Sequence, residues 1–216
     1  MKTSKVVIIN YNAGNLLSVQ RAFEYCGVKA ELTSDHKKIL SASKVVLPGV
    51  GAFGAAMGEL KNSGLDDVIK EIDFKKIPLL GICLGMQLLM QQSEEFGNHN
   101  GLGLIQGKVI PIPPLLNGKK VKIPHIGWNI LNKSKKLQDK DFSILDSVRD
   151  KDFFYFVHSY MVELDNLKNL LATADYGGHK ITSILKKDSI IGCQFHPEKS
   201  GEVGLKIINN FINSKG

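Results

Sequence analysis

Short and largely apolar segments alternate with amphipathic helical segments through the first 90 residues, and this alternation constrains the fold more than any other feature. The predicted strands are Lys5–Asn10, Val28–Leu32, Lys44–Leu47 and Ile77–Ile82. The segments with helical spacing between them are 16–26, 35–40, 52–60 and 65–72. Because strands that are apolar on both faces must be covered on both sides, the pattern predicts a parallel sheet with helices on each face.

The second half of the chain has a different sequence pattern, with β-rich segments separated by hairpin-like turns. These segments are 103–111, 121–130, 153–164, 170–174, 181–185 and 189–195, and a last amphipathic helix is predicted over Glu202–Ile212. No linker or internal repeat interrupts the 216 residues. We therefore expect a single α/β domain over residues 1–216, with a mixed sheet whose first half is parallel and whose second half is largely antiparallel.

Charge and apolar runs set expectations about partners and location. The net charge is +7, but only two of the 28 basic residues are arginines and the lysines are scattered, which favours a solvated surface over a nucleic-acid interface. No apolar run approaches the roughly 18–20 residues of a membrane span, and the apolar segment after Lys5 is too short for a signal peptide. The expected location is the cytoplasm, without nucleic-acid or membrane partners.

The most informative motif surrounds Cys83, where an apolar strand runs through Gly81-Ile82-Cys83-Leu84-Gly85 into a predicted helix. This strand–turn–helix arrangement is typical of a nucleophile elbow, with cysteine in place of serine. A thiol at a helix N-terminus is favoured as the thiolate, and the Leu84 N–H lies beside it as an oxyanion donor. The alternative is a buried structural cysteine between two packing glycines.

A cysteine nucleophile needs a base, and His196 is the strongest candidate among the six histidines. It follows the predicted strand 189–195, and residues two apart on a strand point to the same side. His196 and Glu198 are therefore expected to face one pocket as base and orienting carboxylate. The alternative for a His-Pro-Glu tripeptide taken alone is an exposed position without a role in catalysis.

A glycine-rich turn formed by Gly49, Val50 and Gly51 follows the predicted strand Lys44–Leu47. Such a turn offers backbone N–H groups to an anion, although the phosphate-loop pattern is absent. Because open α/β sheets bind ligands at the carboxyl ends of their strands, this turn and Cys83 can share a pocket.

The remaining histidines and cysteines have simpler interpretations. His158 lies in an apolar strand and is predicted to be a hydrogen-bonded structural residue, and His125 a positioning group. Cys26 and Cys193 are predicted to be inert core thiols. Three widely spaced cysteines provide neither a disulfide framework nor a CxxC motif, and a zinc site from Cys193, His196 and another histidine lacks the usual ligand spacing. We expect no metal and no cofactor.

Together these motifs resemble the class I glutamine amidotransferase family. The resemblance rests first on residues 81–87 and on His196-Pro197-Glu198. Further strings resemble the branch of that family that serves histidine biosynthesis, the glutaminase subunits of imidazole glycerol phosphate synthases: 11–16, 48–51, 124–129, 158–160, 176–178 and 194–200. The matches run from residue 6 to the C-terminal helix.

The resemblance implies a flavodoxin-like core and a glutaminase mechanism. In it, Cys83 attacks the side-chain amide of glutamine, His196 accepts and returns a proton, and Glu198 orients His196. The oxyanion donors would be Leu84 and one amide of the turn Gly49, Val50 and Gly51. The residues implied around glutamine are Gln87, Glu95, Ser159 and Tyr160, the last two through their backbone.

The resemblance also implies a heterodimer with a (β/α)₈-barrel cyclase subunit that receives the ammonia. The implied docking residues are Asn12, Asn15, Trp128, Asn129 and Lys199. Ala13 and Met161 depart from the family pattern, so a paralogous glutaminase subunit of surface-sugar biosynthesis remains an alternative. A catalytically silent regulatory module and a cysteine peptidase are two further alternatives, the latter disfavoured by Gln87.

Overall fold

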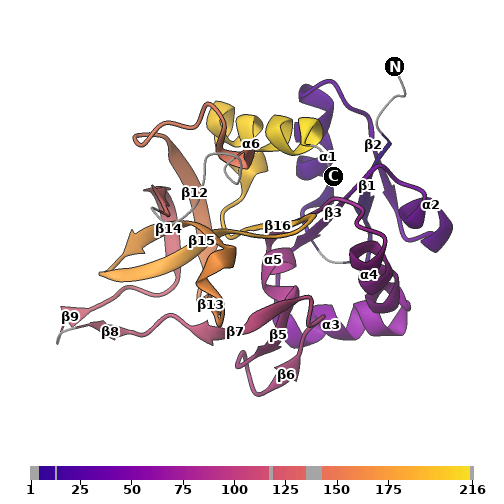
Figure 1. Cartoon of the computed structure of the whole chain (residues 1–216). Coiled ribbons are helices and arrows are strands. Elements are labelled where there is room, and N and C mark those ends of the chain that lie inside the picture. The colour runs from indigo at the N-terminus through magenta and orange to yellow at the C-terminus, as the bar shows by residue number, and fades with distance from the viewer. Residues whose placement is uncertain (1–4, 13, 117–118, 135–142, 215–216) are drawn as a thin grey trace.

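The computed structural model describes residues 5–12, 14–116, 119–134 and 143–214; Ala13 lies outside them. Its main sheet has eight strands in the order β11-β14-β15-β16-β4-β3-β1-β2 (Figure 1). Their bounds are β1 Val6–Ile9, β2 Ala30–Thr33, β3 Lys44–Gly49, β4 Leu79–Cys83, β11 Asn132–Lys133, β14 Leu170–Tyr176, β15 His179–Lys187 and β16 Ile190–Cys193. Strands β16, β4, β3, β1 and β2 are parallel and the rest pair antiparallel, so the predicted mixed sheet is confirmed.

Helices cover both faces of the parallel part. They are α1 Leu16–Tyr25, α2 His36–Leu40, α3 Phe53–Asn62, α4 Leu65–Phe74, α5 Leu84–Leu88 and α6 Gly201–Asn213, with 3₁₀ turns η2 Leu167–Asn169 and η3 Pro197–Lys199. Val6 and Ile8 belong to a core shared with α1 and α6, whereas Val7 and Ile9 belong to the core shared with α2, α3 and α4. A strand buried on both faces needs the apolar sequence that β1 has.

The strands of the second half also build smaller sheets beside the main one. One pairs β10 His125–Ile130 with β12 Phe153–His158, and another has the order β13-β7-β5-β6. The bounds of the remaining strands are β5 Met90–Ser93, β6 His99–Asn100, β7 Ile105–Pro111, β8 Leu115–Leu116, β9 Lys119–Lys120 and β13 Tyr160–Leu164. The predicted β-rich segment 153–164 is therefore two strands that separate at Ser159 and join different sheets.

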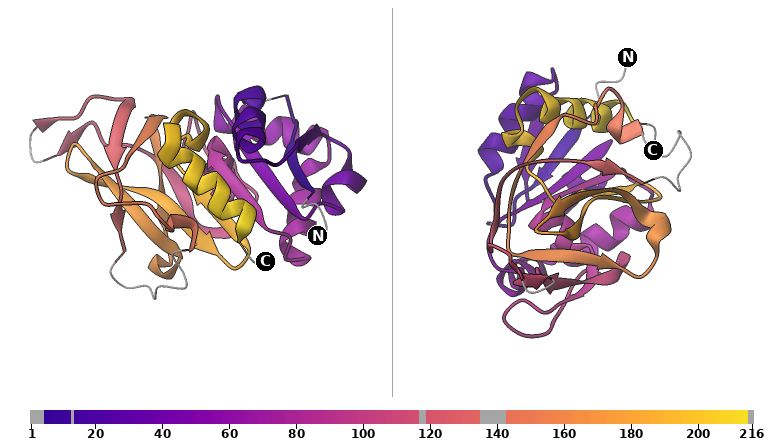
Figure 2. Two further views of the ribbon diagram at one scale, coloured as in Figure 1. Left: turned by 90° about the horizontal axis from the view of Figure 1, so that it is seen from above. Right: turned by 90° about the vertical axis from the view of Figure 1, so that its left-hand side faces the viewer.

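The strands of the second half and the helices of the first half lie at opposite ends of the molecule. Figure 2 shows the strands of residues 100–190 gathered at one end and helices α1 to α4 at the other. Strand β16 lies between them, because it pairs antiparallel with β15 and parallel with β4. The carboxyl ends of β4 and β16 consequently lie side by side. Among the described residues, no helix is both long enough and apolar enough to cross a membrane.

Candidate active site

Cys83 is the last residue of β4 and directly precedes α5. Its backbone has φ +54° and ψ −111°, a conformation that a non-glycine residue adopts only under strain. Gly85 makes the tight turn possible, because a Cβ on this residue would lie 1.8 Å from the carbonyl oxygen of Leu47 in β3. The sequence thus allows α5 to pack directly on β3, and this contact fixes the position of Cys83. Helix α5 has only five residues before β5 begins.

The end of β3 lies beside Cys83, since Gly49 pairs with it in register. A Cβ on Gly49 would lie 2.6 Å from the Tyr11 hydroxyl, so only glycine fits there. That hydroxyl donates to the Pro48 carbonyl at 2.8 Å. Burial, and secondarily Cys83, raise the pKa of Tyr11, which therefore keeps its proton and its hydrogen bond to the loop.

His196 and Glu198 form a buried pair, joined by a 2.7 Å contact between Nδ1 and Oε1, with side chains 3% and 1% exposed. The sequence expectation that strand alternation aligns them is wrong, because β16 ends at Cys193 and the 3₁₀ turn η3 begins after His196. The 3₁₀ turn η3, and not a strand, therefore brings the side chains of His196 and Glu198 together. The pairing was thus predicted for the wrong geometric reason.

The electrostatics of His196 favour its charged form. Burial lowers its pKa, but Cys83 and Glu198 outweigh burial and raise it to about 10. Its second ring nitrogen, Nε2, is buried and has no hydrogen-bond partner among the described residues. An imidazole whose Nδ1 is held by a carboxylate and whose Nε2 has no hydrogen-bond partner among those residues is arranged to exchange a proton at Nε2 with Cys83 or a ligand.

Ser200 ties the His196 segment to β12. Its hydroxyl donates to the His196 carbonyl at 2.6 Å and accepts from the Tyr155 N–H at 3.0 Å. The Tyr155 carbonyl in turn accepts from the His196 N–H at 2.9 Å. These three hydrogen bonds hold the backbone of His196 against a neighbouring sheet.

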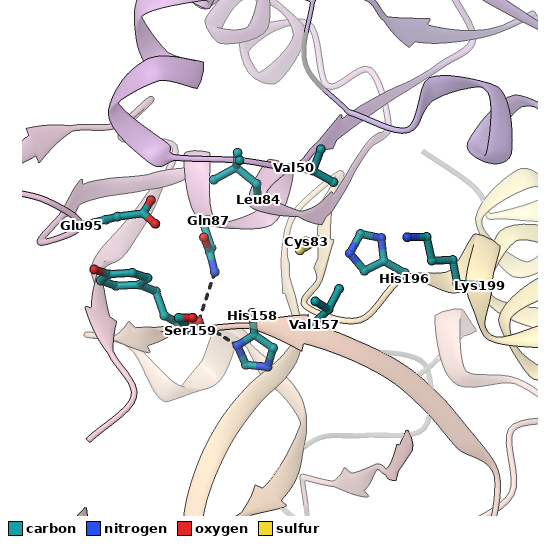
Figure 3. Close-up of a pocket in the computed structure, with 12 residues that line it drawn as sticks. Val50, Cys83, Leu84, Gln87, Glu95, Val157, His158, Ser159, His196 and Lys199 are labelled. Atoms are coloured by element: carbon teal, nitrogen blue, oxygen red, sulfur yellow. Dashed lines mark hydrogen bonds between the residues drawn. The ribbon is translucent and has the colours of Figure 1, made fainter. Parts of the chain in front are cut away.

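A cavity of about 330 Å³ opens above Cys83 (Figure 3). Its lining residues are Val50, Gly51, Cys83, Leu84, Gln87, Glu95, Val157, His158, Ser159, Tyr160, His196 and Lys199. Figure 3 shows His196 and Lys199 on one side of Cys83, and Gln87 and Glu95 on the other. The cavity thus brings together ten of the residues predicted as site residues, while Gly49 and Glu198 do not line it. Val157 and His158 line it without having been predicted as site residues.

The polar side chains of the cavity are held in place by the surrounding strands and helices. Gln87 donates through Nε2 to the Tyr160 carbonyl at 3.2 Å (Figure 3). The Glu95 carboxylate accepts from the backbone N–H of Phe53, the first residue of α3. A carboxylate is favoured at a helix N-terminus, so Glu95 links the cavity to the loop between β3 and α3.

One buried residue at this site escaped the sequence analysis. Gln194 is 0% exposed, donates through Nε2 to the Cys83 sulfur at 3.7 Å, and accepts through Oε1 from Gln87 at 3.0 Å. The string 194–200 contained it, but a single amide after an apolar strand gives no sign of the direction in which its side chain points.

His158 and His125 form a buried hydrogen-bonded pair. His158 donates from Nδ1 to the Tyr160 carbonyl at 2.8 Å, so its Nε2 accepts from Nδ1 of His125 at 3.0 Å. Burial lowers the pKa of His158 to about 3 and that of His125 to about 4. Both rings are neutral, and His158 is a buried, hydrogen-bonded residue, as predicted; His125, predicted to be a positioning group, is the residue that holds it.

Of the residues expected to meet a partner, Asn12 and Asn15 follow the carboxyl end of β1 and Lys199 follows that of β16, whereas Trp128 and Asn129 lie in β10. Asn12, Asn15, Trp128 and Lys199 are exposed. Trp128 packs edge-on against Tyr155, with ring centroids 5.7 Å apart. Asn129 is partly buried instead, and its Nδ2 donates to the Asp175 carbonyl at 2.8 Å.

The described residues contain no group of three His, Cys, Asp or Glu side chains that could hold a metal ion. Cys193 is buried and Cys26 partly buried, and burial raises the pKa of both thiols. Neither is poised as a nucleophile.

Comparison with known proteins identifies the family of this chain. The family model "Glutamine amidotransferase class-I" matches residues 7–214. This chain therefore belongs to the class I glutamine amidotransferase family.

Its relatives are more specific. The chain is 46% identical to imidazole glycerol phosphate synthase subunit HisH 1 of Legionella pneumophila (strain Lens), over 97% of this chain and 99% of that protein. It is 44% identical to subunit HisH of Sulfurimonas denitrificans, over 95% and 96% of the two chains. A crystal structure of a glutamine amidotransferase shares the fold, with a TM-score of 0.70, 14% identity and coverage of 96% and 99%. The resemblance predicted from the motifs is confirmed.

Proposed function

We propose that this chain is the glutaminase subunit of an imidazole glycerol phosphate synthase, which hydrolyses glutamine and passes ammonia to a cyclase subunit. The observation that carries the proposal is the strained Cys83 turn, which shares a cavity with a His196 held by Glu198. The full-length identity to HisH subunits supports the histidine-pathway assignment. The proposed location is the cytoplasm.

The chemistry starts from a Cys83 thiolate and a protonated His196, a pair that the raised pKa of His196 favours. The sulfur attacks the side-chain amide carbon of glutamine and the carbonyl oxygen becomes an oxyanion. His196 then gives its Nε2 proton to the leaving nitrogen, so that ammonia departs and a γ-glutamyl thioester remains. Water attacks the thioester while His196 accepts a proton from it, the C–S bond breaks, and glutamate is released as the Cys83 thiolate and the protonated His196 are restored.

Two groups of backbone amides are proposed to stabilise the oxyanion. The Leu84 N–H follows the nucleophile at the start of α5, and the turn Gly49, Val50 and Gly51 provides the second donor beside it. The register of Gly49 with Cys83 supports this assignment. By general experience one such donor contributes about 10²–10³ in rate.

Glutamine is proposed to occupy the cavity between Gln87 and Glu95 on one side and His196 on the other. The cavity volume of about 330 Å³ suits a ligand of this size. The Glu95 carboxylate offers a counter-charge for the α-ammonium group. Ser159 and Tyr160 contribute backbone groups at the point where β12 and β13 separate.

The partner is proposed to be a (β/α)₈-barrel cyclase that forms a heterodimer with this chain. Free ammonia would be protonated and diluted in water, so its use requires direct transfer across an interface. Asn12, Asn15, Trp128, Asn129 and Lys199 are the proposed docking residues. The positions of Asn12, Asn15 and Lys199 after the carboxyl ends of parallel strands, with Lys199 lining the Cys83 cavity, and the exposure of Trp128 support the assignment.

The test is glutamate release from glutamine, with and without the candidate cyclase. We expect release that depends on Cys83 and that is coupled to imidazole glycerol phosphate formation. Growth of a histidine auxotroph lacking its own glutaminase subunit separates this function from surface-sugar biosynthesis. Failure of both the coupled assay and the growth rescue would contradict the proposal.

A further inference from the structure

Gln194 lies behind Cys83 at the junction of the main sheet and the cavity. It directly follows β16, and its backbone N–H donates to the Ser183 carbonyl of β15 at 2.9 Å. Its side chain is 0% exposed and does not line the cavity, so it cannot touch a bound glutamine. Any effect of Gln194 on the reaction must pass through its two neighbours, Cys83 and Gln87.

The direction of each hydrogen bond around Gln194 is fixed by a backbone carbonyl. The Tyr160 oxygen can only accept, so the Gln87 atom facing it is the Nε2 donor. The same Nε2 faces Gln194, which must therefore present its oxygen to Gln87. The remaining atom of the amide, Nε2 of Gln194, is the one that faces the Cys83 sulfur. The chain of donors leaves no freedom to reverse the amide.

The Tyr160 carbonyl is itself held on its other side by the His158 ring at 2.8 Å. His158 is held by His125, whose ring stacks on Tyr176 with centroids 3.9 Å apart. The polar chain therefore begins in the second-half strands and ends at the sulfur. Gln194, Gln87, His158 and His125 are buried members of this chain, and a buried hydrogen-bond network holds its members firmly.

We propose that Gln194 is a positioning residue of the glutaminase reaction: it donates a hydrogen bond that holds the Cys83 sulfur, and it locks the amide of Gln87 toward the glutamine cavity. The inference rests on the proposed function. An N–H directed at the sulfur supports the thiolate before attack. Because both Nε2 protons of Gln87 are used, on Tyr160 and Gln194, Oε1 of Gln87 is the atom left to accept from the substrate.

The experiment compares Gln194→Met, which keeps the length of the side chain but removes both hydrogen bonds, with Gln20→Met. Gln20 is the matched control, because it is a partly buried glutamine whose Nε2 donates to the Ala30 carbonyl at 2.9 Å and which does not line the cavity. The full-length chain is alkylated with iodoacetamide, and each cysteine-containing peptide is followed by mass spectrometry. Kinetics of glutamate release are measured in the complex with the cyclase.

In Gln194→Met we expect alkylation of Cys83 to slow about tenfold, the low end for a hydrogen bond to a charged acceptor because sulfur accepts weakly. The kcat for glutamate release falls by a similar factor, and KM rises because Gln87 is no longer fixed. Gln20→Met leaves both unchanged. Cys193, buried in the core, stays unmodified in a folded variant and so reports folding in the same sample.

Gln194→Glu provides a second variant of the same shape. Because burial and the Cys83 sulfur raise the pKa of such a carboxyl, it is compared at rising pH: once ionised it keeps an acceptor for Gln87 but loses the donor to sulfur, so kcat falls while KM stays near the wild-type value. Wild-type alkylation of Cys83 with Cys193 protected in Gln194→Met would overturn the inference. Reactive Cys193 in both variants would also overturn it, by making Gln194 a core residue only. A wild-type complex without glutaminase activity would contradict the proposed function instead, since alkylation does not depend on turnover.

Discussion

Replacing Glu198 with glutamine isolates the role of the charge behind His196. The carboxylate and the imidazole are 2.7 Å apart, with side chains 1% and 3% exposed. Glutamine has the same length, and its carbonyl oxygen still accepts the Nδ1–H of His196. The Glu198→Gln variant therefore keeps the orientation of the ring and removes the negative charge that stabilises the imidazolium.

The expected magnitude follows from the burial of this pair. A hydrogen bond to a charged group contributes about 1.5–3 kcal/mol, and poor exposure to solvent keeps this one unscreened. Because each 1.36 kcal/mol corresponds to about a factor of ten in rate, kcat should fall about 10- to 100-fold. KM should stay unchanged, since Glu198 does not line the cavity.

The assay is single-turnover formation of the γ-glutamyl thioester at saturating glutamine in the complex with the cyclase. Glu202→Gln is the control, because Glu202 is an exposed carboxylate four residues further along the same segment. A wild-type rate of thioester formation in Glu198→Gln would show that the carboxylate only supports the fold. A raised KM with unchanged kcat would place it in substrate binding and refute the reasoning equally.

Three further predictions concern stability and coupling. Because the pKa of His196 is raised, the folded state binds this proton more tightly than the unfolded state does. The stabilisation from this proton is complete below the usual pKa of 6.5 and is lost as the pH rises through about 10. The midpoint of thermal unfolding should therefore fall between these pH values, and less steeply in Glu198→Gln. Gly85→Ala should lower the free energy of unfolding by about 1–3 kcal/mol, because the new Cβ meets the Leu47 carbonyl. Gly58→Ala in α3 should not, because the space around its new methyl group is open. Equal midpoints of thermal unfolding for the two variants would contradict the close packing. Lys199→Ala should raise the ratio of glutamate to imidazole glycerol phosphate by letting ammonia leak, and an unchanged ratio with unchanged affinity would remove Lys199 from the interface.

The parallel part of the fold was predictable because its strands are apolar on both faces. Val6 to Ile9 serve two cores at once, and a sequence of this kind has few other uses. The predicted helical segment 35–40 is confirmed as α2, and the Asp35 side chain caps it by accepting from the Lys38 N–H. Local chemistry decides these elements, so local sequence reveals them.

The second half was harder to predict because its strands are distributed among several sheets, and the local sequence does not specify which strands pair. The sequence around Ser159 gives no sign that β12 and β13 belong to different sheets. Met90–Ser93 forms β5 between β6 and β7, which pair with it on each side. Partners distant in sequence decide these strands.

The candidate site shows the same division between local and distant information. Cys83 and His196 were found from their own neighbourhoods in the sequence. Gln194 was not found, because its importance lies in contacts with residues more than 100 positions away.

The central claim is that this chain supplies only the ammonia, through Cys83, and that the cyclase does the rest. The most direct measurement is product formation by the Cys83→Ala complex with glutamine and, separately, with ammonium salt at high pH. We expect no glutamine-dependent product and wild-type ammonia-dependent turnover. Glutamine-dependent product in this variant, or loss of ammonia-dependent turnover in a correctly assembled complex, would contradict it.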